Sequence, residues 1–247
     1  LKDSVTADRE TKASYTVTVN ASDATDTTSQ AFTISVGDVN EAPTLTVPTG
    51  GSVTEDASTS TITGSLTSAD PENDTPSYSV VGATATEGAY TVTGSYGTLV
   101  LNATTGAYTY TLNNTATAVQ TLGGSSSVTE TFSVQVTDGP NTPDAQSLSF
   151  TIQGANDAPS APTLDNSAID ENIAGDTVGT LSSTDAESDS VSYTIADSGD
   201  GGSFEIDGST LKLKDSVTAD RETKASYTVT VNASDATDTT SQAFTIS

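Results

Sequence analysis

The sequence predicts an all-β protein built from tandem β-sandwich domains. Short segments in which apolar and polar residues alternate recur along its 247 residues, without a helical period. Clusters of Asp, Asn, Gly and Pro separate these segments, as turns separate the strands of a sandwich. Residues 1–35 return unchanged as residues 213–247, so the chain is a window on a tandem array with a period of 212 residues. Such a period should hold two sandwiches of about 100 residues each.

Three parts are expected. Residues 1–37 should be the C-terminal part of a truncated domain, residues 38–157 a second domain with its linker, and residues 158–247 the complete copy of the first. In the truncated part, alternation predicts two antiparallel strands, at 15–19 and 30–34. The same signal predicts strands at 60–66, 77–81, 89–93, 97–102, 106–112, 130–137 and 146–153, and then at 168–169, 176–181, 190–195, 203–206, 210–213, 226–232 and 242–246. A single helical turn is expected within residues 116–122.

The alternation also predicts which side chains are buried. In the complete copy the expected core is Val178, Leu181, Tyr193, Ile195, Phe204, Ile206, Leu211, Leu213, Tyr227, Val229, Val231, Phe244 and Ile246. In the second domain, the tyrosines of alternating runs are also better explained as core than as a binding surface.

Composition excludes several classes of protein. The chain has no cysteine and no histidine, so it has no disulfides, no thiolate zinc site and no usual general base, and we expect no enzyme. The chain has 33 acidic and only 7 basic residues, and this excess of negative charge disfavours nucleic acid as a partner. No apolar run approaches the roughly 20 residues needed to span a bilayer, so membrane insertion is not expected. The hydrophobic fraction is 33% and the net charge is −26, values at which a chain can also be disordered in the absence of metal, and this alternative stays open.

The distribution of charge points to cations. No basic residue lies between Ala13 and Leu211, although that span carries most of the carboxylates. These carboxylates either stay solvated and repel one another, or bound cations neutralise them where they cluster. Two stretches that combine acidic and amide residues with a proline, 37–43 and 154–159, read as stiff connectors between domains. Oxygen-rich side chains at such hinges suit a hard cation such as Ca²⁺.

The last part closely resembles a bacterial cadherin-like repeat. The residues that carry the resemblance are Ile-Asp-Glu-Asn at 169–172, Asp-Ala-Glu at 185–187, Asp-Arg-Glu at 220–222, Val-Asn-Ala-Ser-Asp at 231–235 and the linker Asp-Val-Asn-Glu-Ala-Pro at 38–43. The middle part resembles a VCBS repeat, an immunoglobulin-like module, through the segments 53–56, 70–74, 106–112, 119–123 and 154–159. Together the resemblances imply the extender region of a giant repeats-in-toxin type bacterial adhesin, exported by type I secretion to the cell surface, where it serves cell adhesion and biofilm formation.

The cadherin resemblance implies Ca²⁺ ligands at the junctions. At the first junction they would be Asp8, Glu10, Asp38, Asn40, Glu41, Asp70, Glu72, Asp74 and Asp138. At the second they would be Glu55 or Asp56, Asn156, Asp157, Asp185, Glu187, Asp189 and Asp235, with fewer or weaker ions because the middle domain has no Asp-Arg-Glu motif. Asp220 and Glu222 should serve a third junction, and Glu171 of the first-strand motif is a further candidate ligand. For each residue a solvated turn is the alternative.

Other interpretations remain open at this point. Asp170 and Asp176 are expected to be turn or cap residues, and the segment 197–202 a flexible loop rather than a calcium loop, because it lacks the EF-hand spacing. The repeats themselves could bind glycans or neighbouring cells through exposed loops. Because residues 1–35 match the last strands of the complete domain, they could also replace those strands in another chain.

Overall fold

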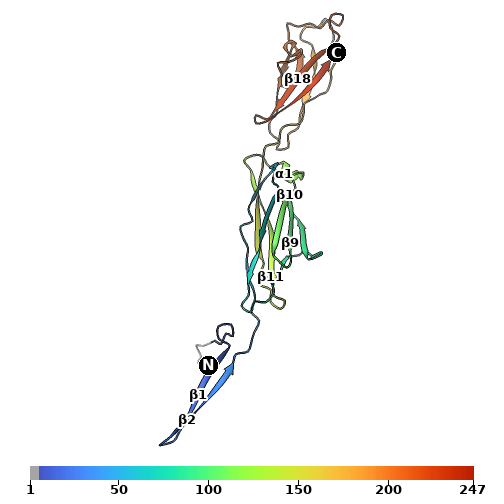
Figure 1. Ribbon diagram of the computed structural model, residues 1–247. Helices are drawn as coiled ribbons and strands as arrows, with labels where there is room; N and C mark the ends of the chain where they lie inside the picture. Colours follow the sequence, from blue (N-terminus) through green and yellow to red (C-terminus); the bar gives the residue numbers. More distant parts are fainter. Residues whose placement is uncertain (1–5) are drawn as a thin grey trace.

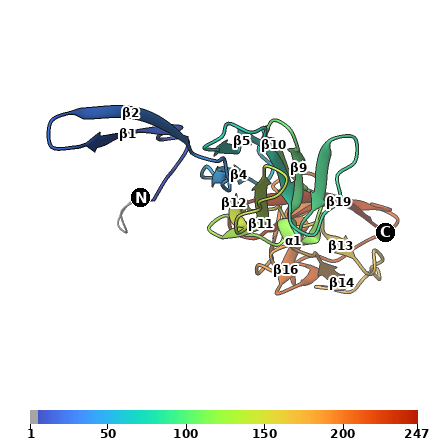
Figure 2. The ribbon, with the colours of Figure 1, turned by 90° about the horizontal axis from the view of Figure 1, so that it is seen from below.

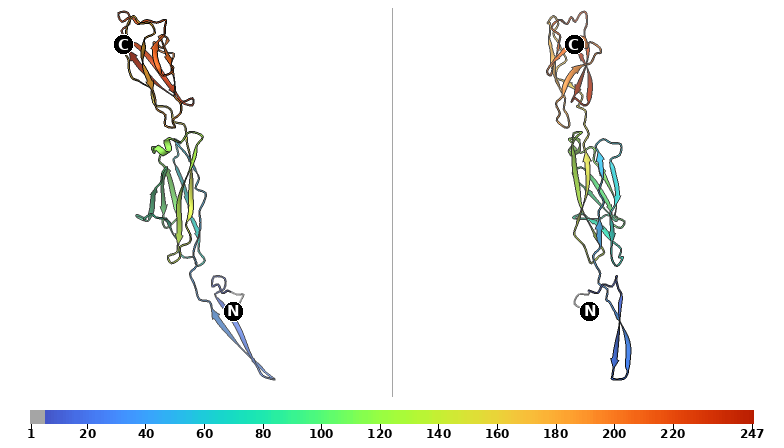
Figure 3. Two further views of the ribbon diagram at one scale, coloured as in Figure 1. Left: turned by 180° about the vertical axis from the view of Figure 1, so that it is seen from behind. Right: turned by 90° about the vertical axis from the view of Figure 1, so that its left-hand side faces the viewer.

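The protein is a rod of three parts arranged end to end. The computed structural model describes residues 6–247, and Figure 1 shows a hairpin, a first sandwich and a second sandwich in chain order along one axis. Figure 3 shows the same extended arrangement from two further sides. In the described part of the chain, no helix is long and apolar enough to cross a membrane.

The N-terminal part is an isolated β-hairpin. Strands β1 (Ser14–Ser22) and β2 (Thr27–Ser35) pair antiparallel, from Ser14 opposite Ser35 to Ser22 opposite Thr27. The turn between them is closed by Asp23, whose Oδ1 accepts hydrogen bonds from the backbone N–H groups of Thr25 and Asp26 at 2.8 and 2.7 Å. Figure 2 shows the hairpin standing apart from all other strands. Its apolar residues therefore face solvent.

The middle part is a sandwich of two four-stranded sheets. One sheet has the order β5-β10-β9-β8 and the other the order β4-β12-β11-β7, in which β4 runs parallel to β12. Their bounds are β4 Ser52–Thr54, β5 Thr61–Ser65, β7 Ser77–Val80, β8 Ala89–Thr93, β9 Gly97–Asn102, β10 Ala107–Leu112, β11 Ser127–Thr137 and β12 Gln146–Gln153. The short strands β3 (Thr44–Thr46) and β6 (Thr67–Ala69) pair beside them, and α1 (Thr117–Gln120) is the expected helical turn.

An aromatic cluster joins the two sheets of the middle part. The rings of Tyr110 and Phe150 stack with their centroids 4.3 Å apart, and Phe132 packs edge-on against Phe150. The Tyr110 hydroxyl donates a 2.7 Å hydrogen bond to Oε2 of the buried Glu130. The other oxygen of Glu130 accepts the Tyr96 backbone N–H at 3.0 Å, which ties the β8–β9 turn to β11. The one buried carboxylate on β11 is thus fully partnered, as burial of a charged group requires.

The last part is a second sandwich with the predicted core. Its sheets have the orders β13-β14-β17-β16 and β15-β18-β19. The bounds are β13 Thr163–Leu164, β14 Thr177–Ser182, β15 Ser192–Ile195, η1 Gly201–Ser203, β16 Phe204–Asp207, β17 Thr210–Leu213, β18 Tyr227–Ser234 and β19 Thr239–Ile246. All thirteen residues predicted for this core belong to one buried cluster or pack against it, which confirms that prediction. The fold class is confirmed as tandem β-sandwiches.

Two local predictions need correction. No strand forms at residues 168–169: instead the Ile169 N–H donates to the Ser247 carbonyl at 3.2 Å, and the Ile169 side chain packs against the core. The segment 197–202 is a loop, as predicted, but an anchored one. Asp200 Oδ2 accepts the Thr228 N–H at 2.9 Å, and its other oxygen pairs with Lys224. Four strands of two or three residues, β3, β4, β6 and β13, were not predicted because so short a run shows no alternation.

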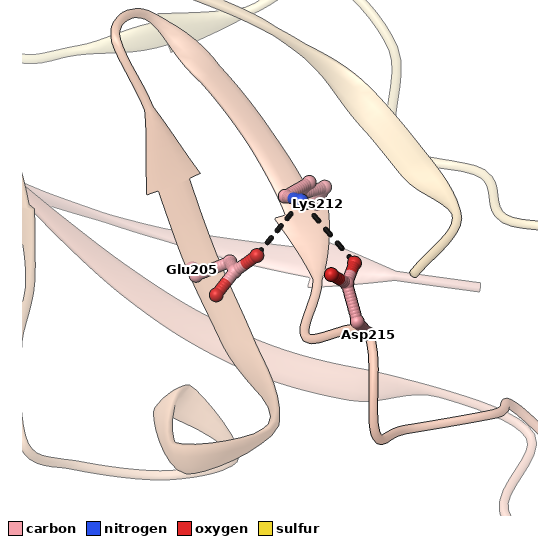
Figure 4. Close-up of polar contacts among 3 residues, drawn as sticks. All are labelled: Glu205, Lys212 and Asp215. Carbon is pink, nitrogen blue, oxygen red and sulfur yellow. Dashed lines mark hydrogen bonds and ion pairs between the residues drawn. The ribbon is translucent and has the colours of Figure 1, made fainter. Parts of the chain in front are cut away.

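Ion pairs hold only the ends of the rod. In residues 6–247 they are Arg9–Asp38, Lys212–Glu205, Lys212–Asp215 and Lys224–Asp200. Figure 4 shows Lys212 on β17 between Glu205 of β16 and Asp215 of the following turn, at 2.8 and 3.4 Å. Among these described residues, Asp38 is the one carboxylate of the middle part that forms an ion pair, with Arg9.

Candidate metal sites at the domain junctions

At the first junction, three carboxylates from three segments converge. Glu10 precedes the hairpin, Glu41 lies in the linker and Glu72 lies in the loop after β6; one oxygen of each lies within 4.8 Å of the others. The Glu41 backbone N–H also donates to Glu72 Oε2 at 3.3 Å. The structure therefore brings together one predicted ligand from each side of the junction and one from the linker.

An amide and an aspartate attach this linker to the middle domain. Asn40 Nδ2 donates a 2.5 Å hydrogen bond to Asp138 Oδ2, and the Asn40 carbonyl accepts a 2.9 Å bond from Asn141 Nδ2. Asp138 Oδ1 accepts the Asn141 N–H at 2.9 Å. These bonds fix the direction in which the linker leaves the domain and point its carboxylates toward Glu72.

The negative charges of Glu10, Glu41 and Glu72 repel one another. A hydrogen bond shared with Glu72, together with desolvation and repulsion from nearby carboxylates, raises the pKa of Glu41 to about 7. Asp70 Oδ2 and Glu72 Oε1 are buried and have no hydrogen-bond partner. The Arg9 guanidinium pairs with the Asp38 carboxylate at an N–O distance of 3.8 Å, and both side chains are about half exposed. Buried acceptors without a donor are rare in native proteins, and a cation would satisfy these oxygens.

Three further predicted ligands of this junction already have partners, two of them in turns and one in an ion pair. Asp8 accepts the N–H and the hydroxyl of Thr11 at 2.9 and 3.0 Å and stands outside the three-carboxylate group. Asp70 Oδ1 accepts the Asp74 N–H at 2.9 Å, which closes the acidic loop and leaves Asp70 Oδ2 without a partner. Asp38 pairs with Arg9. These residues shape the site rather than meeting at one point.

The second junction repeats the same connections. Asn156 Nδ2 donates to Asp235 Oδ2 at 3.0 Å, as Asn40 does to Asp138. The Asp157 N–H donates to Glu187 Oε1 at 3.4 Å, as the Glu41 N–H does to Glu72. The repetition of these bonds at two separate linkers shows that both are built on one plan.

Unpartnered carboxylate oxygens gather here too. Asp157 Oδ2, Asp185 Oδ2 and Glu187 Oε2 are buried without a hydrogen-bond partner. Burial, and then the nearby Asp56 and Asp185, raise the pKa of Asp157; burial is the largest cause of the raised pKa of Glu187 as well. Asp185 Oδ1 meanwhile accepts the N–H groups of Glu187 and Asp189 at 3.1 and 2.9 Å, so its second oxygen points away from its own turn.

The two junctions differ on the side of the preceding domain. Glu55, which is 2% exposed, accepts Gln120 Nε2 at 2.8 Å and the Ala155 N–H at 3.2 Å, and burial raises its pKa. Gln120 ends α1, so this helical turn contributes a side chain to the second junction. The sequence analysis missed Gln120, and also Asp238, whose Oδ2 accepts Asn156 Nδ2 at 2.9 Å. The position of Asp238 opposite Asp235 across the β18–β19 turn was the available signal.

A third group lies at the free end of the last domain. Glu171, Asp220 and Glu222 each place an oxygen within 4.8 Å of the others, and all three are exposed. The Arg221 N–H donates to Glu171 Oε2 at 3.4 Å. Asp170 and Asp176, predicted as turn or cap residues, flank the turn at residues 171–175, across which the Asp170 N–H donates to Asp176 Oδ2 at 2.7 Å.

The donor sets fit a hard cation. They consist of carboxylate and amide oxygens and contain no thiolate or imidazole, which is the chemistry that Ca²⁺ prefers. Each junction draws these oxygens from a linker and the domain loops beside it, so a bound ion would neutralise repelling carboxylates and hold the segments together.

Comparison with known proteins gives each sandwich a match to a cadherin-type family profile. Residues 40–154 match the profile of the bacterial cadherin-like domain, and residues 165–247 that of the cadherin domain. No curated protein matches the chain.

Many solved structures share the fold. A four-domain fragment described as PcdhgB3 EC1-4 is 18% identical, with a TM-score of 0.63 over 98% of this chain and 58% of that one. Domains 1–5 of protocadherin Gamma B2 are 20% identical, with a TM-score of 0.61 over 97% of this chain and 46% of that one. Mouse cadherin-23 EC22-24 is 16% identical, with a TM-score of 0.58 over 98% of this chain and 76% of that one. The chain spans less than two thirds of the length of the first of these structures, and likeness at such identity shows the fold alone.

Proposed function

Because the chain consists of tandem cadherin-like repeats, we propose that it is a spacer of an extracellular adhesion protein, stiffened by Ca²⁺ at its domain junctions. The observation that carries this proposal is the set of five buried carboxylate oxygens without partners: two at the first junction and three at the second. They lie beside linkers that are otherwise fixed by hydrogen bonds, so an ion is the missing component.

The high negative charge of the chain would make its folding depend on Ca²⁺. Without ions, the carboxylates of residues 13–211 repel one another with no basic residue among them. Binding of ions to the folded state alone adds stability by mass action, and it locks each linker to the domain loops around it. The chain would be loose where Ca²⁺ is scarce and a stiff rod where it is abundant. The ligands are those predicted from the sequence, with Gln120 and Asp238 as further members of the second junction.

At a finer level, we place this rod in a giant bacterial adhesin of the repeats-in-toxin type. Its repeats, including a middle domain of VCBS character bounded at 38–157 between parts 1–37 and 158–247, would project a distal binding domain from the bacterial surface for adhesion and biofilm formation. Export by type I secretion suits a chain that folds only where Ca²⁺ is abundant. The internal period of 212 residues supports this placement, since long spacers are built by repetition.

The alternative, that the repeats themselves bind glycans, has less support. Its distinguishing feature would be a cluster of surface aromatic rings. Tyr78, Tyr108 and Tyr110 are buried, and the other five tyrosines are half-buried. The tyrosines of the two sandwiches therefore pack in or against the cores rather than forming an exposed cluster.

Calorimetric titration with Ca²⁺ tests the proposal. The wild-type chain should bind several ions, and the double variant Asp157→Asn/Glu187→Gln should lose those of the second junction while keeping those of the first. Asp207→Asn is the control, because it removes one charge from an exposed position at the end of β16 that is not a predicted ligand. Absence of binding by the wild type at millimolar Ca²⁺ would sink the proposal.

A further inference from the structure

The segment between β10 and the end of α1 contacts two neighbouring carboxylates that follow β4. Asn114 Nδ2 donates a hydrogen bond to Asp56 Oδ1 at 3.2 Å. Gln120 Nε2 donates to Oε1 of the adjacent Glu55 at 2.8 Å. The other oxygen of Glu55 accepts the Ala155 N–H of the linker at 3.2 Å. Two amide side chains of this segment thus reach toward the linker of the second junction through the carboxylates that they bond.

Asp56 itself lies beside the linker aspartate. Burial, and then the charge of Asp56 and a hydrogen bond shared with it, raise the pKa of Asp157. Asp157 Oδ2 is buried and has no hydrogen-bond partner. Neither carboxylate belongs to the ion pairs formed within residues 6–247. Two carboxylates from separate segments therefore approach each other without a compensating ion pair.

Asn114 adds a neutral oxygen to this group. An ionised carboxylate only accepts hydrogen bonds, so the Asn114 amide must turn Nδ2 toward Asp56 and Oδ1 away from it. This Oδ1 is buried and has no hydrogen-bond partner. Within residues 6–247, seven buried side-chain atoms have no partner; five are the junction carboxylate oxygens described above, and Asn114 Oδ1 is the one amide oxygen among the seven. It is in the same state as the carboxylate oxygens proposed to bind Ca²⁺.

The turn after β10 holds Asn114 in place. The Asn113 N–H donates to the Tyr96 carbonyl at 2.8 Å, and the Ala116 N–H donates to the Asn113 carbonyl at 3.0 Å. Asn113 Oδ1 accepts the N–H and the hydroxyl of Thr115 at 3.2 and 2.9 Å. The Asn113 side chain is therefore used within the turn, whereas the Asn114 side chain leaves the turn toward the junction.

We infer that Asn114 Oδ1 is a Ca²⁺ ligand of the second junction and that it acts together with Asp56 and Asp157. This inference rests on the proposed function, which it extends by a ligand from a segment without a calcium motif. Amide carbonyl oxygens are regular ligands of Ca²⁺. An ion here would give partners to Asn114 Oδ1 and Asp157 Oδ2 and would offset the repulsion between the two aspartates. It would also attach the middle domain, which lacks an Asp-Arg-Glu motif, to the linker.

An NMR titration of the 247-residue chain with Ca²⁺ tests this inference. The side-chain amide signal of Asn114 should shift as Ca²⁺ is added, with the same midpoint as the signal of Asn156, which bonds Asp235 at this junction. The signal of Asn113, which is used within its own turn, should stay nearly constant. An ordered water molecule could also satisfy the Asn114 oxygen. If the Asn156 signal shifts and that of Asn114 does not, the partner is water and the inference is wrong.

Matched variants separate ligation from a structural role. Asn114→Ala removes the oxygen and should weaken calorimetric Ca²⁺ binding at the second junction by about tenfold or more, while the ions of the first junction bind as before. Asn114→Asp keeps an oxygen but loses the donor to Asp56, so it should melt at a lower temperature in chelator and yet bind Ca²⁺ at least as tightly as the wild type. Asn113→Asp adds the same charge at an exposed position one residue earlier and should leave Ca²⁺ binding unchanged.

The outcomes distinguish this inference from the proposed function. Equal Ca²⁺ affinity of the wild type and Asn114→Ala, with the second-junction ions still lost in Asp157→Asn/Glu187→Gln, overturns the inference and leaves the proposed function intact. Weak binding by Asn114→Asp as well as by Asn114→Ala also overturns it, because Asn114 would then only position Asp56 through its hydrogen bond. Absence of Ca²⁺ binding by the wild type contradicts both.

Discussion

The repeated hairpin gives a self-controlled test of how the last domain is stabilised. Ile246 on β19 and Ile34 on β2 occupy the same place in identical sequences, but Ile246 is 0% exposed and Ile34 is 55% exposed. Ile246→Ala removes three buried carbons, which costs about 2.4 kcal/mol at roughly 0.8 kcal/mol each, and the cavity raises the cost to about 3 kcal/mol. Ile34→Ala removes the same atoms from an exposed face and should cost less than about 0.5 kcal/mol.

Scanning calorimetry in chelator measures both effects. For a domain of this size 1 kcal/mol shifts the melting temperature by roughly 4–8 °C, so Ile246→Ala should lower the transition of the last domain by about 12 °C or more. Ile34→Ala should leave all transitions within about 2 °C of the wild type. Equal losses in the two variants would refute the reasoning, because they would mean that both hairpins are packed.

Three other predictions concern single groups. Tyr110→Phe should destabilise the middle domain by about 1–3 kcal/mol in urea unfolding, because it leaves Oε2 of the buried Glu130 without its 2.7 Å partner, whereas Tyr90→Phe should be near neutral. In chelator, Glu72→Gln should lower the pKa of Glu41, seen by carboxyl NMR titration; an unchanged value near 7 would refute the pairing. Because that pKa is raised in the folded state, stability that the protonated Glu41 provides at low pH should be lost as the pH rises from about 4.5 to about 7, and should return when Ca²⁺ is added. Asp200→Ala should lower the melting temperature of the last domain by several degrees, since Thr228 N–H and Lys224 lose their acceptor, while Asp197→Ala should not.

Most of the fold could be predicted because the strands are half-buried. Alternation along residues 226–232 and 242–246 predicted β18 and β19 to within three residues at each end, and their buried faces as well. The strands that were not predicted are the short ones. β3, β4, β6 and β13 have two or three residues, which is below the length at which a period of two can be recognised. The strand predicted at residues 168–169 does not form. The Ile169 N–H donates instead to the Ser247 carbonyl, which is distant in sequence.

The junction residues were only partly predictable. Proline and clustered oxygen donors marked both linkers, and the structure brings Asn40 to Asp138 and Asn156 to Asp235 across 98 and 79 residues. The roles of Gln120 and Asp238 depend on α1 and on the β18–β19 turn; the position of Asp238 across that turn from Asp235 was a local signal, whereas no local pattern indicates Gln120. Asp8 and Asp38, which the motifs treat as equals of Glu10 and Glu41, lie in a turn and an ion pair instead. Sequence identifies the donor types, whereas the fold decides which donors meet.

Small-angle X-ray scattering of the chain, with millimolar Ca²⁺ and then with chelator, tests the central claim most directly. The account predicts a stiff rod with Ca²⁺ and a bent or swollen particle, with a broader distribution of distances, once the ions are removed. Identical profiles in the two conditions would contradict it, because the linker carboxylates would then be acidic turns and not the ligands that hold the domains in line.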